Sequence, residues 1–203
     1  MNPLSRMVQD GAAAEEMARY LDSLSHASRR RAVEGMKRAE MALLFEKVSG
    51  SLPLDLDHFV PPEHPPLMEV VHWGKNSLPA FTRFSKRMCR PTGPADDILW
   101  GYNEGSSLVA NAVGPGYFIA RAGEEADTPV WIDYHQLPTG KPDHWPKVLK
   151  NSSRLSFFVY NKTIDKMRRV SEHVTIGAAY KNGRMMGAYF MLCREDVTID
   201  QRA

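Results

Sequence analysis

The sequence predicts an α+β fold: an N-terminal helical hairpin, then a curved, mainly antiparallel sheet of about five strands packed on one long helix. Residues 12–49 contain no proline and are rich in residues that favour helices. After Asp97, apolar residues follow a period of two, and the expected strands are grouped rather than alternating with helices. A chain of 203 residues can bury a core without disulfide or metal support.

The expected helices of the N-terminal hairpin meet at the serine-rich stretch 23–28. Met17 and Leu21 fall on one face of the first helix. In the second helix an apolar residue recurs about every 3.6 positions from Val33 onward, and Gly50 is the expected end. One face of the hairpin therefore packs, while the other faces water.

Proline dominates the segment that follows, with eight of the 14 prolines between residues 53 and 94. Proline prevents a long helix and disfavours central strands, so the segment is interpreted as a connector that its aromatic residues hold on the folded body. Within it, residues 78–88 are expected to form a short helix. The predicted division is a hairpin (residues 1–50), a connector (51–96) and an α+β domain (97–203), which together make one compact unit.

Three strands are expected in the first part of the α+β domain, at residues 98–102, 117–121 and 130–134, because aromatic and β-branched residues gather there between turn-forming clusters. A helix is then expected from residue 153 to about residue 170. Its core face is indicated by Phe157, Tyr160, Ile164 and Met167, at positions i, i+3, i+7 and i+10.

The strongest local pattern predicts a β-hairpin from Val174 to Arg194, with a type I′ turn at Asn182-Gly183. A two-residue loop would place Tyr180 opposite Met185 and Ala178 opposite Gly187. Both faces of this hairpin are apolar, so we expect the 153–170 helix on one side. The other side would meet the N-terminal helices or a ligand cavity.

Composition narrows the class of protein. No secretory signal begins the chain and no apolar run reaches the length of a membrane span, so a soluble, cytoplasmic protein is expected. Cys89 and Cys193 lie far apart without metal-binding spacing, which indicates free thiols in a reducing compartment. A net charge of +2 argues against a dedicated nucleic-acid binder. No motif indicates a cofactor. His58, His64 and His72 show no recognised ligand spacing, so no metal site is predicted.

The function that the sequence favours is binding of a small, partly apolar ligand in a pocket between sheet and helix. The two-sided apolar hairpin and 11 methionines favour an adaptable pocket, although they equally suit an irregular core. Aromatic and hydroxyl side chains in and around the loops between strands are the expected contacts. The predicted ligand-binding residues are Trp100, Tyr102, Ser106, Tyr117, Tyr134 and Tyr189.

Two alternatives remain open. One is a small enzyme using general acid–base or hydrolytic chemistry, for which the candidate catalytic residues are Glu104, Asp133, His135 and His173. The other is an interaction module, in which residues 12–49 dock onto a protein partner or a second copy of the chain as a homodimer.

Overall fold

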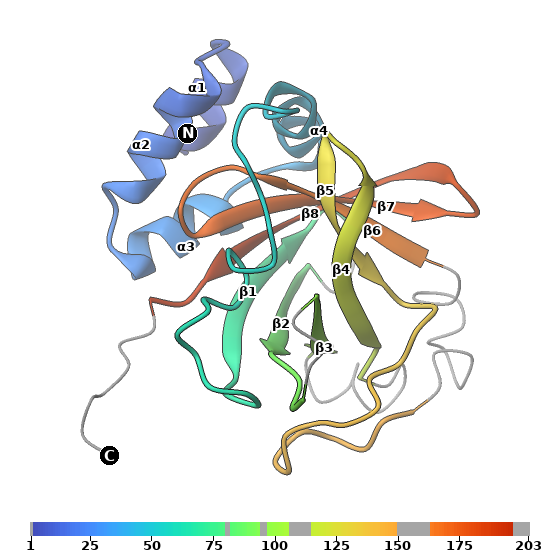
Figure 1. Cartoon of the computed structure of the whole chain (residues 1–203). Coiled ribbons are helices and arrows are strands. Elements are labelled where there is room, and N and C mark those ends of the chain that lie inside the picture. The colour runs from blue at the N-terminus through green and yellow to red at the C-terminus, as the bar shows by residue number, and fades with distance from the viewer. Residues whose placement is uncertain (1, 80–81, 94–96, 106–114, 150–162, 197–203) are drawn as a thin grey trace.

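The computed structural model describes residues 2–79, 82–93, 97–105, 115–149 and 163–196. Within these residues, eight antiparallel strands close into a barrel and four short helices lie against its outer surface (Figure 1). Every strand pairs with its neighbours in the chain, and the last strand pairs with the first. The predicted α+β architecture is therefore wrong: the described sheet has eight strands rather than about five, and it closes on itself instead of packing on one long helix.

The helices are α1 (Pro3–Gln9), α2 (Ala14–Asp22), α3 (His26–Glu34) and α4 (Arg38–Lys47). The strands are β1 (Val70–Asn76), β2 (Arg83–Cys89), β3 (Ile98–Glu104), β4 (Tyr117–Glu125), β5 (Thr128–Asp133), β6 (Thr163–Arg169), β7 (Val174–Lys181) and β8 (Arg184–Arg194).

Strands β1 and β2 lie in the segment that the sequence predicts to be a proline-rich connector. The prolines flank both strands and none lies inside them, as strand geometry requires. The predicted short helix over residues 78–88 is wrong, because Arg83–Cys89 is a strand. Alternation is hard to recognise here because two of the buried residues, His72 and Lys86, are polar.

Strand β6 replaces the C-terminal part of the predicted 153–170 helix, and residues 153–162 of that prediction lie outside the described residues. Ile164 and Met167 do have helical spacing, but this part of the chain does not form a helix. Instead Thr163, Asp165 and Met167 are buried on one side of the strand, in a period of two. Two of these three residues, Thr163 and Asp165, are polar, so the strand lacks an apolar alternation.

The three strands expected between residues 98 and 134 are confirmed as β3, β4 and β5. The predicted hairpin is confirmed as β7 and β8, and positive φ angles of 51° at Asn182 and 75° at Gly183 agree with its type I′ turn. Tyr180 pairs with Met185 as predicted, but Ala178 pairs with Tyr189 rather than Gly187. A bulge shifts the register by two residues, which leaves each side chain on its predicted face.

The N-terminal segment forms four helices in the described chain rather than a hairpin of two. The second expected helix is interrupted at residues 35–37, where the buried Glu40 caps the start of α4. Its Oε2 accepts hydrogen bonds from the Lys37 backbone N–H and the Ser5 hydroxyl, both at 2.8 Å. Gln9 donates to its Oε1 at 3.0 Å. The Glu40 carboxylate thus joins α1 to residues 35–37, where the expected helix is interrupted. Helix periodicity cannot predict such a long-range contact.

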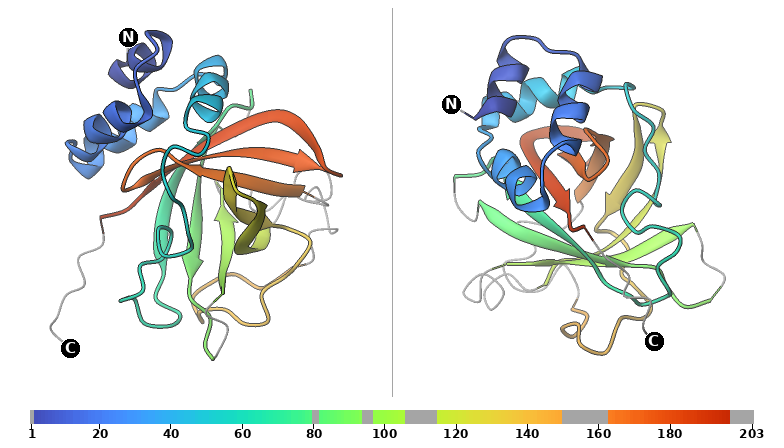
Figure 2. Two further views of the ribbon diagram at one scale, coloured as in Figure 1. Left: turned by 45° about the horizontal axis from the view of Figure 1, so that its top comes forward. Right: turned by 90° about the vertical axis from the view of Figure 1, so that its left-hand side faces the viewer.

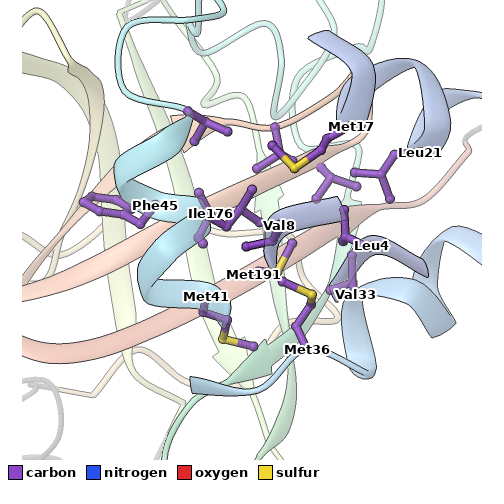
Figure 3. Close-up of a cluster of buried hydrophobic side chains, with 14 of the residues drawn as sticks. Leu4, Val8, Met17, Leu21, Val33, Met36, Met41, Phe45, Ile176 and Met191 are labelled. Atoms are coloured by element: carbon purple, nitrogen blue, oxygen red, sulfur yellow. The ribbon is translucent and has the colours of Figure 1, made fainter. Parts of the chain in front are cut away.

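The helices gather over the outer face of β7 and β8 (Figure 2). Their apolar sides meet Ile176 and Met191 in a cluster to which Leu4, Met17 and Phe45 contribute (Figure 3). The N-terminal helices are therefore one of the two layers expected around the hairpin, while the predicted cover by a 153–170 helix is wrong where the chain is described. The other face of the hairpin lines the barrel interior.

The segment between α4 and β1 covers the end of the barrel at which β1 begins, here named the capped end. Phe59 and Val60 join the interior apolar cluster with strand residues such as Met88 and Phe118. The Val60 carbonyl accepts a hydrogen bond of 2.7 Å from Arg90, directly after β2. The opposite end, at which β2 and β6 begin, is named the distal end.

None of the helices in the described residues has the length and apolar character needed to cross a membrane.

Candidate functional site in the barrel interior

Four polar side chains meet inside the barrel, toward the distal end. Lys86 belongs to β2, Asn103 to β3 and Asp165 to β6, while Tyr134 directly follows β5. All four side chains are buried, and Lys86 is only 2% exposed. We name these residues the Lys86 cluster. A fully buried lysine is rare unless it has a partner, so the cluster is the first place to look for function.

Each N–H of the Lys86 ammonium can reach an acceptor. Lys86 Nζ lies 2.9 Å from Asn103 Oδ1, 2.5 Å from the Tyr134 hydroxyl and 3.4 Å from Asp165 Oδ2. The Tyr134 hydroxyl in turn donates to Asp165 Oδ2 at 3.3 Å. Asn103 Nδ2 lies 3.0 Å from that hydroxyl and 3.1 Å from the Gly116 carbonyl, which orients the amide. The cluster is therefore a connected network and not a chance pair of charges.

Aromatic rings surround the Lys86 nitrogen. It lies 4.9 Å from the ring centroid of Phe118, 5.0 Å from that of Phe190, 5.1 Å from that of Tyr134 and 5.6 Å from that of Phe84. The negative faces of such rings attract a cation in a site without water. The same rings give an apolar ligand body something to pack against.

Three glycines make room for the phenylalanine rings. Each phenylalanine lies across a strand pair from a glycine, in the pairs Gly74–Phe84, Gly101–Phe118 and Gly177–Phe190. A Cβ added at Gly101 would lie 2.3 Å from the Phe118 ring, and one at Gly177 would lie 2.4 Å from the Phe190 ring. Any larger residue at these positions would displace a ring from Lys86. The glycines therefore build the site although they carry no chemistry.

Burial and pairing act in opposite directions on the protons of the cluster. Burial lowers the pKa of Lys86, and Asp165 partly opposes this. Burial also raises the pKa of Asp165, opposed by Lys86 and by the Tyr134 hydrogen bond. Both directions favour the form in which the proton has moved from the amine to the carboxyl group. The cluster can thus present a neutral amine beside a carboxylic acid.

His72 lies beside the cluster, opposite Lys86 in the β1–β2 register and opposite Arg194 in the β1–β8 register. Burial, reinforced by Arg194, lowers the pKa of His72 to about 3, although nearby backbone carbonyls act in the other direction. Neither ring nitrogen makes a hydrogen bond within the described part of the chain. His72 is therefore a neutral residue of the barrel interior. Among the described residues, no group of three or more His, Cys, Asp or Glu side chains could hold a metal ion.

The predicted catalytic residues lie in three places. Asp133 accepts a hydrogen bond from the backbone of His135 at 2.8 Å, and its other carboxylate oxygen lies 3.2 Å from Arg121 Nε. His173 lies beyond the other end of β6 and is 3.4 Å from Asp196. Glu104, half-exposed, binds Ser85 at 3.0 Å and also Arg87.

The structure thus brings Asp133 and His135 together, but it brings neither His173 nor Glu104 to them. An enzymatic role for these four residues stays a prediction.

The predicted ligand-binding residues are also distributed. Trp100, Tyr102 and Tyr117 join Trp145 in an aromatic cluster on the outer face of the barrel, covered by the segment after β5. Tyr189 packs on Phe45 of α4, with ring centroids 5.8 Å apart. Ser106 lies outside the described residues. Of the set, Tyr134 alone belongs to the Lys86 cluster.

A groove of about 250 Å³ lies outside the barrel, between α3 and strands β1 and β2. Arg30 and Trp73 both line this groove, and the Arg30 guanidinium lies 3.9 Å from the ring centroid of Trp73. Glu34 pairs with both Arg30 at 2.8 Å and Arg83 at 3.1 Å. Because Glu34 already pairs with both arginines and Arg83 is exposed, the groove is a weaker candidate than the barrel interior.

Both cysteines are free and buried, and burial raises the pKa of each to about 12. Lys86, Arg87 and Arg90, which are near Cys89 in the sequence, therefore do not activate its thiol. A cytoplasmic location stays a prediction.

The apolar sides of the N-terminal helices are covered by the barrel, so a partner or homodimer bound through residues 12–49 would meet their polar sides. That interface also stays a prediction.

Sequence reasoning missed Lys86, Asn103 and Asp165. One signal was available: Phe84, Lys86 and Met88 alternate as in a strand, with a lysine where an apolar residue is expected.

Compared with known proteins, the chain matches no protein-family model, no curated protein and no solved structure. The geometry of the Lys86 cluster is therefore the main indication of function.

Proposed function

We propose that the chain binds a small, uncharged, partly apolar molecule inside the barrel, with a carbonyl oxygen of that molecule held by Lys86 and Tyr134. The observation that carries the proposal is the buried lysine, whose amine converges with a phenol, an amide and a carboxyl group among aromatic rings. An eight-stranded barrel is wide enough to be filled by side chains or to hold one small ligand.

The energetics favour a functional reason for the cluster. Burying a charged pair costs several kcal/mol per ion before the pair's own attraction is counted, and apolar residues of similar volume often stabilise a core as well or better. Most of the remaining interior uses such residues, including Leu99, Val130 and Ile132. A barrel selected for stability alone would have little use for Lys86 and Asp165 at the same depth.

The charge of the cluster indicates the class of ligand. Lys86 and Asp165 have no net charge together, whichever of them holds the proton. A carboxylate placed beside them would add an uncompensated negative charge to a buried site, at a high cost in desolvation. A ketone or aldehyde adds none. Its oxygen accepts a hydrogen bond from Lys86 Nζ, and one from the Tyr134 hydroxyl once a protonated Asp165 no longer accepts from that hydroxyl.

Calorimetric titration with three matched probes tests the proposal: acetophenone, ethylbenzene and benzoate. Acetophenone has the ring and the carbonyl oxygen, ethylbenzene lacks the oxygen, and benzoate adds a negative charge. We expect acetophenone to bind about tenfold more tightly than ethylbenzene, the equivalent of one hydrogen bond, and benzoate to bind most weakly.

The Lys86→Met/Asp165→Asn variant should bind acetophenone and ethylbenzene equally. Lys166→Met is the matched control, because Lys166 lies on the outer side of β6 and pairs with Glu125. It should behave as the unmodified chain does. Equal affinity of the unmodified chain for all three probes, or no binding of any, would contradict the proposal.

A further inference from the structure

The amine of Lys86 has the surroundings of a nucleophile rather than those of an ordinary surface lysine. Its nitrogen lies 3.4 Å from the Asp165 carboxyl group and 2.5 Å from the Tyr134 hydroxyl, and both partners are buried with it. An amine attacks a carbonyl carbon only when it is unprotonated, and the reaction then needs an acid to release water. Asp165 is placed to take the proton from the amine and return it.

We propose that Lys86 forms an imine with an aldehyde or ketone bound in the barrel, and that Asp165 transfers the protons of this reaction. The inference rests on the proposed function, since the same carbonyl group must first bind beside Lys86. It goes further by assigning a covalent bond to one nitrogen atom and a role to each neighbour.

The reaction balances without any further reactant. The Lys86 amine adds to the carbonyl carbon, and a proton moves from the nitrogen to the oxygen to give a carbinolamine. Asp165, as a carboxylic acid, then protonates the hydroxyl group, which leaves as water while the C=N bond forms. The resulting iminium loses its N–H proton to the Asp165 carboxylate, and the neutral imine remains. When Asp165 holds the proton, it no longer needs the hydrogen bond from the Tyr134 hydroxyl, and that hydroxyl can donate to the carbonyl oxygen during the addition.

Burial supports this assignment. The pKa of Lys86 is lowered by desolvation, so a larger fraction of its amine is free near neutral pH than for an exposed lysine. Each unit of lowering raises that fraction about tenfold while the amine is mostly protonated. Burial also raises the pKa of Asp165, which favours the protonated carboxyl group that the reaction needs as its acid.

Lys166 offers an internal comparison. It also pairs with a carboxylate, Glu125, and its nitrogen lies 4.8 Å from the ring centroid of Trp131 and 4.5 Å from that of Tyr180. It faces the outside of the barrel, however, and Glu125 is exposed. If proximity to a carboxylate and aromatic rings were enough, Lys166 would react as Lys86 does. The inference predicts that it does not.

The test is reductive trapping of the full chain with benzaldehyde and sodium cyanoborohydride at pH 6.5. Cyanoborohydride donates a hydride to the imine carbon and leaves a stable benzyl group on the reacting nitrogen. Peptide mapping by mass spectrometry locates that group. We expect a benzyl group on Lys86 at a rate at least about tenfold above that of Lys166, because burial lowers the pKa of Lys86.

Three variants make the result specific. Lys86→Arg keeps a positive charge but forms no stable imine, so it should lose the fast labelling. Lys166→Met should keep it. Asp165→Asn keeps the amine and removes the acid, so labelling of Lys86 should become slower and its dependence on pH should change. If Asp165→Asn left both the rate and the pH profile unchanged, the assigned role of Asp165 would be wrong.

The outcomes separate this inference from the function on which it rests. Labelling of Lys86 at the rate of the other lysines, while acetophenone still binds in the Lys86-dependent manner described above, would overturn the imine and leave the binding site intact. If acetophenone does not bind and Lys86 is not labelled, both proposals fail. Mapping on the unmodified chain gives a decision even if a variant fails to fold.

Discussion

Replacing Lys86 by methionine removes one member of the buried pair while keeping a side chain of similar length. Asp165 would then remain in the barrel without its partner, 5% exposed. An unpaired carboxylate at such a site takes up a proton instead of staying charged. The Lys86→Met variant should therefore fold with a neutral Asp165, at a cost that depends on pH.

The size of that cost follows from the ordinary pKa of an aspartate. Protonating a group of pKa about 3.9 costs about 1.5 kcal/mol at pH 5 and about 4 kcal/mol at pH 7. The gain from no longer burying the polar Lys86 amine group changes little over this range. Relative to the unmodified chain, the variant should therefore lose about 2.7 kcal/mol more at pH 7 than at pH 5. The sign is that of an acid whose pKa is higher in the folded state, so stability falls as pH rises.

Urea unfolding followed by tryptophan fluorescence, at pH 5, 6 and 7, measures the difference. Lys86→Met/Asp165→Asn is the matched control, because asparagine cannot titrate, and its loss of stability should be the same at all three values. If the single variant also showed a loss independent of pH, Asp165 would not depend on Lys86, and the coupled pair would be refuted.

Three further predictions follow from the interior and from the buried thiols. Because the pKa of His72 falls to about 3, the unfolded chain binds more protons than the folded chain below pH 6.5. His72 should therefore account for about 2 kcal/mol of the stability lost between pH 7 and pH 5, and urea unfolding of His72→Leu should show a loss smaller by that amount. Gly101→Ala should cost about 1–3 kcal/mol by thermal or urea unfolding, since its Cβ would meet Phe118, and adding Phe118→Leu should recover part of this. Cys89 and Cys193 should react with Ellman's reagent at pH 8 only after unfolding, because burial raises both pKa values to about 12; rapid reaction of the native chain would contradict this.

Local patterns predicted the parts of the fold that local chemistry decides. The hairpin from Val174 to Arg194 was predictable because Asn182-Gly183 accepts the positive φ angles of its turn. Strands β3 to β5 were predictable because their aromatic and β-branched residues fit a pleated surface. The shift of two residues in the hairpin register comes from a bulge, which no turn signal indicates.

The barrel itself was not predictable for a reason that also concerns function. Strands β1, β2 and β6 direct His72, Lys86 and Asp165 into the interior, so their sequences lack the apolar alternation of a half-buried strand. The polar residues that obscure the strand pattern in the sequence are the ones that form the candidate site or lie beside it. Places where sequence rules fail are expected to be functional or strained, and here the failures converge on one polar cluster.

The partners of Lys86 were equally beyond the reach of sequence spacing. Lys86 and Asp165 are 79 positions apart, and closure of the barrel brings their strands to the same depth. Of the residues selected from the sequence, Tyr134 reached the interior because it directly follows β5 and continues the inward side of Val130 and Ile132. The role of the glycines opposite Phe84, Phe118 and Phe190 can be recognised only once the strand pairs are known.

The most direct test of the central claim is to locate a bound carbonyl compound by NMR. Intermolecular nuclear Overhauser effects from the acetophenone methyl group should reach Phe118 and Phe190, and the ¹³C resonance of its carbonyl carbon should move downfield through hydrogen bonding to Lys86 and Tyr134. Lys86→Met/Asp165→Asn should remove the downfield shift. Contacts to Trp73 in the outer groove instead, or a carbonyl resonance that does not move in the unmodified chain, would contradict a carbonyl site inside the barrel.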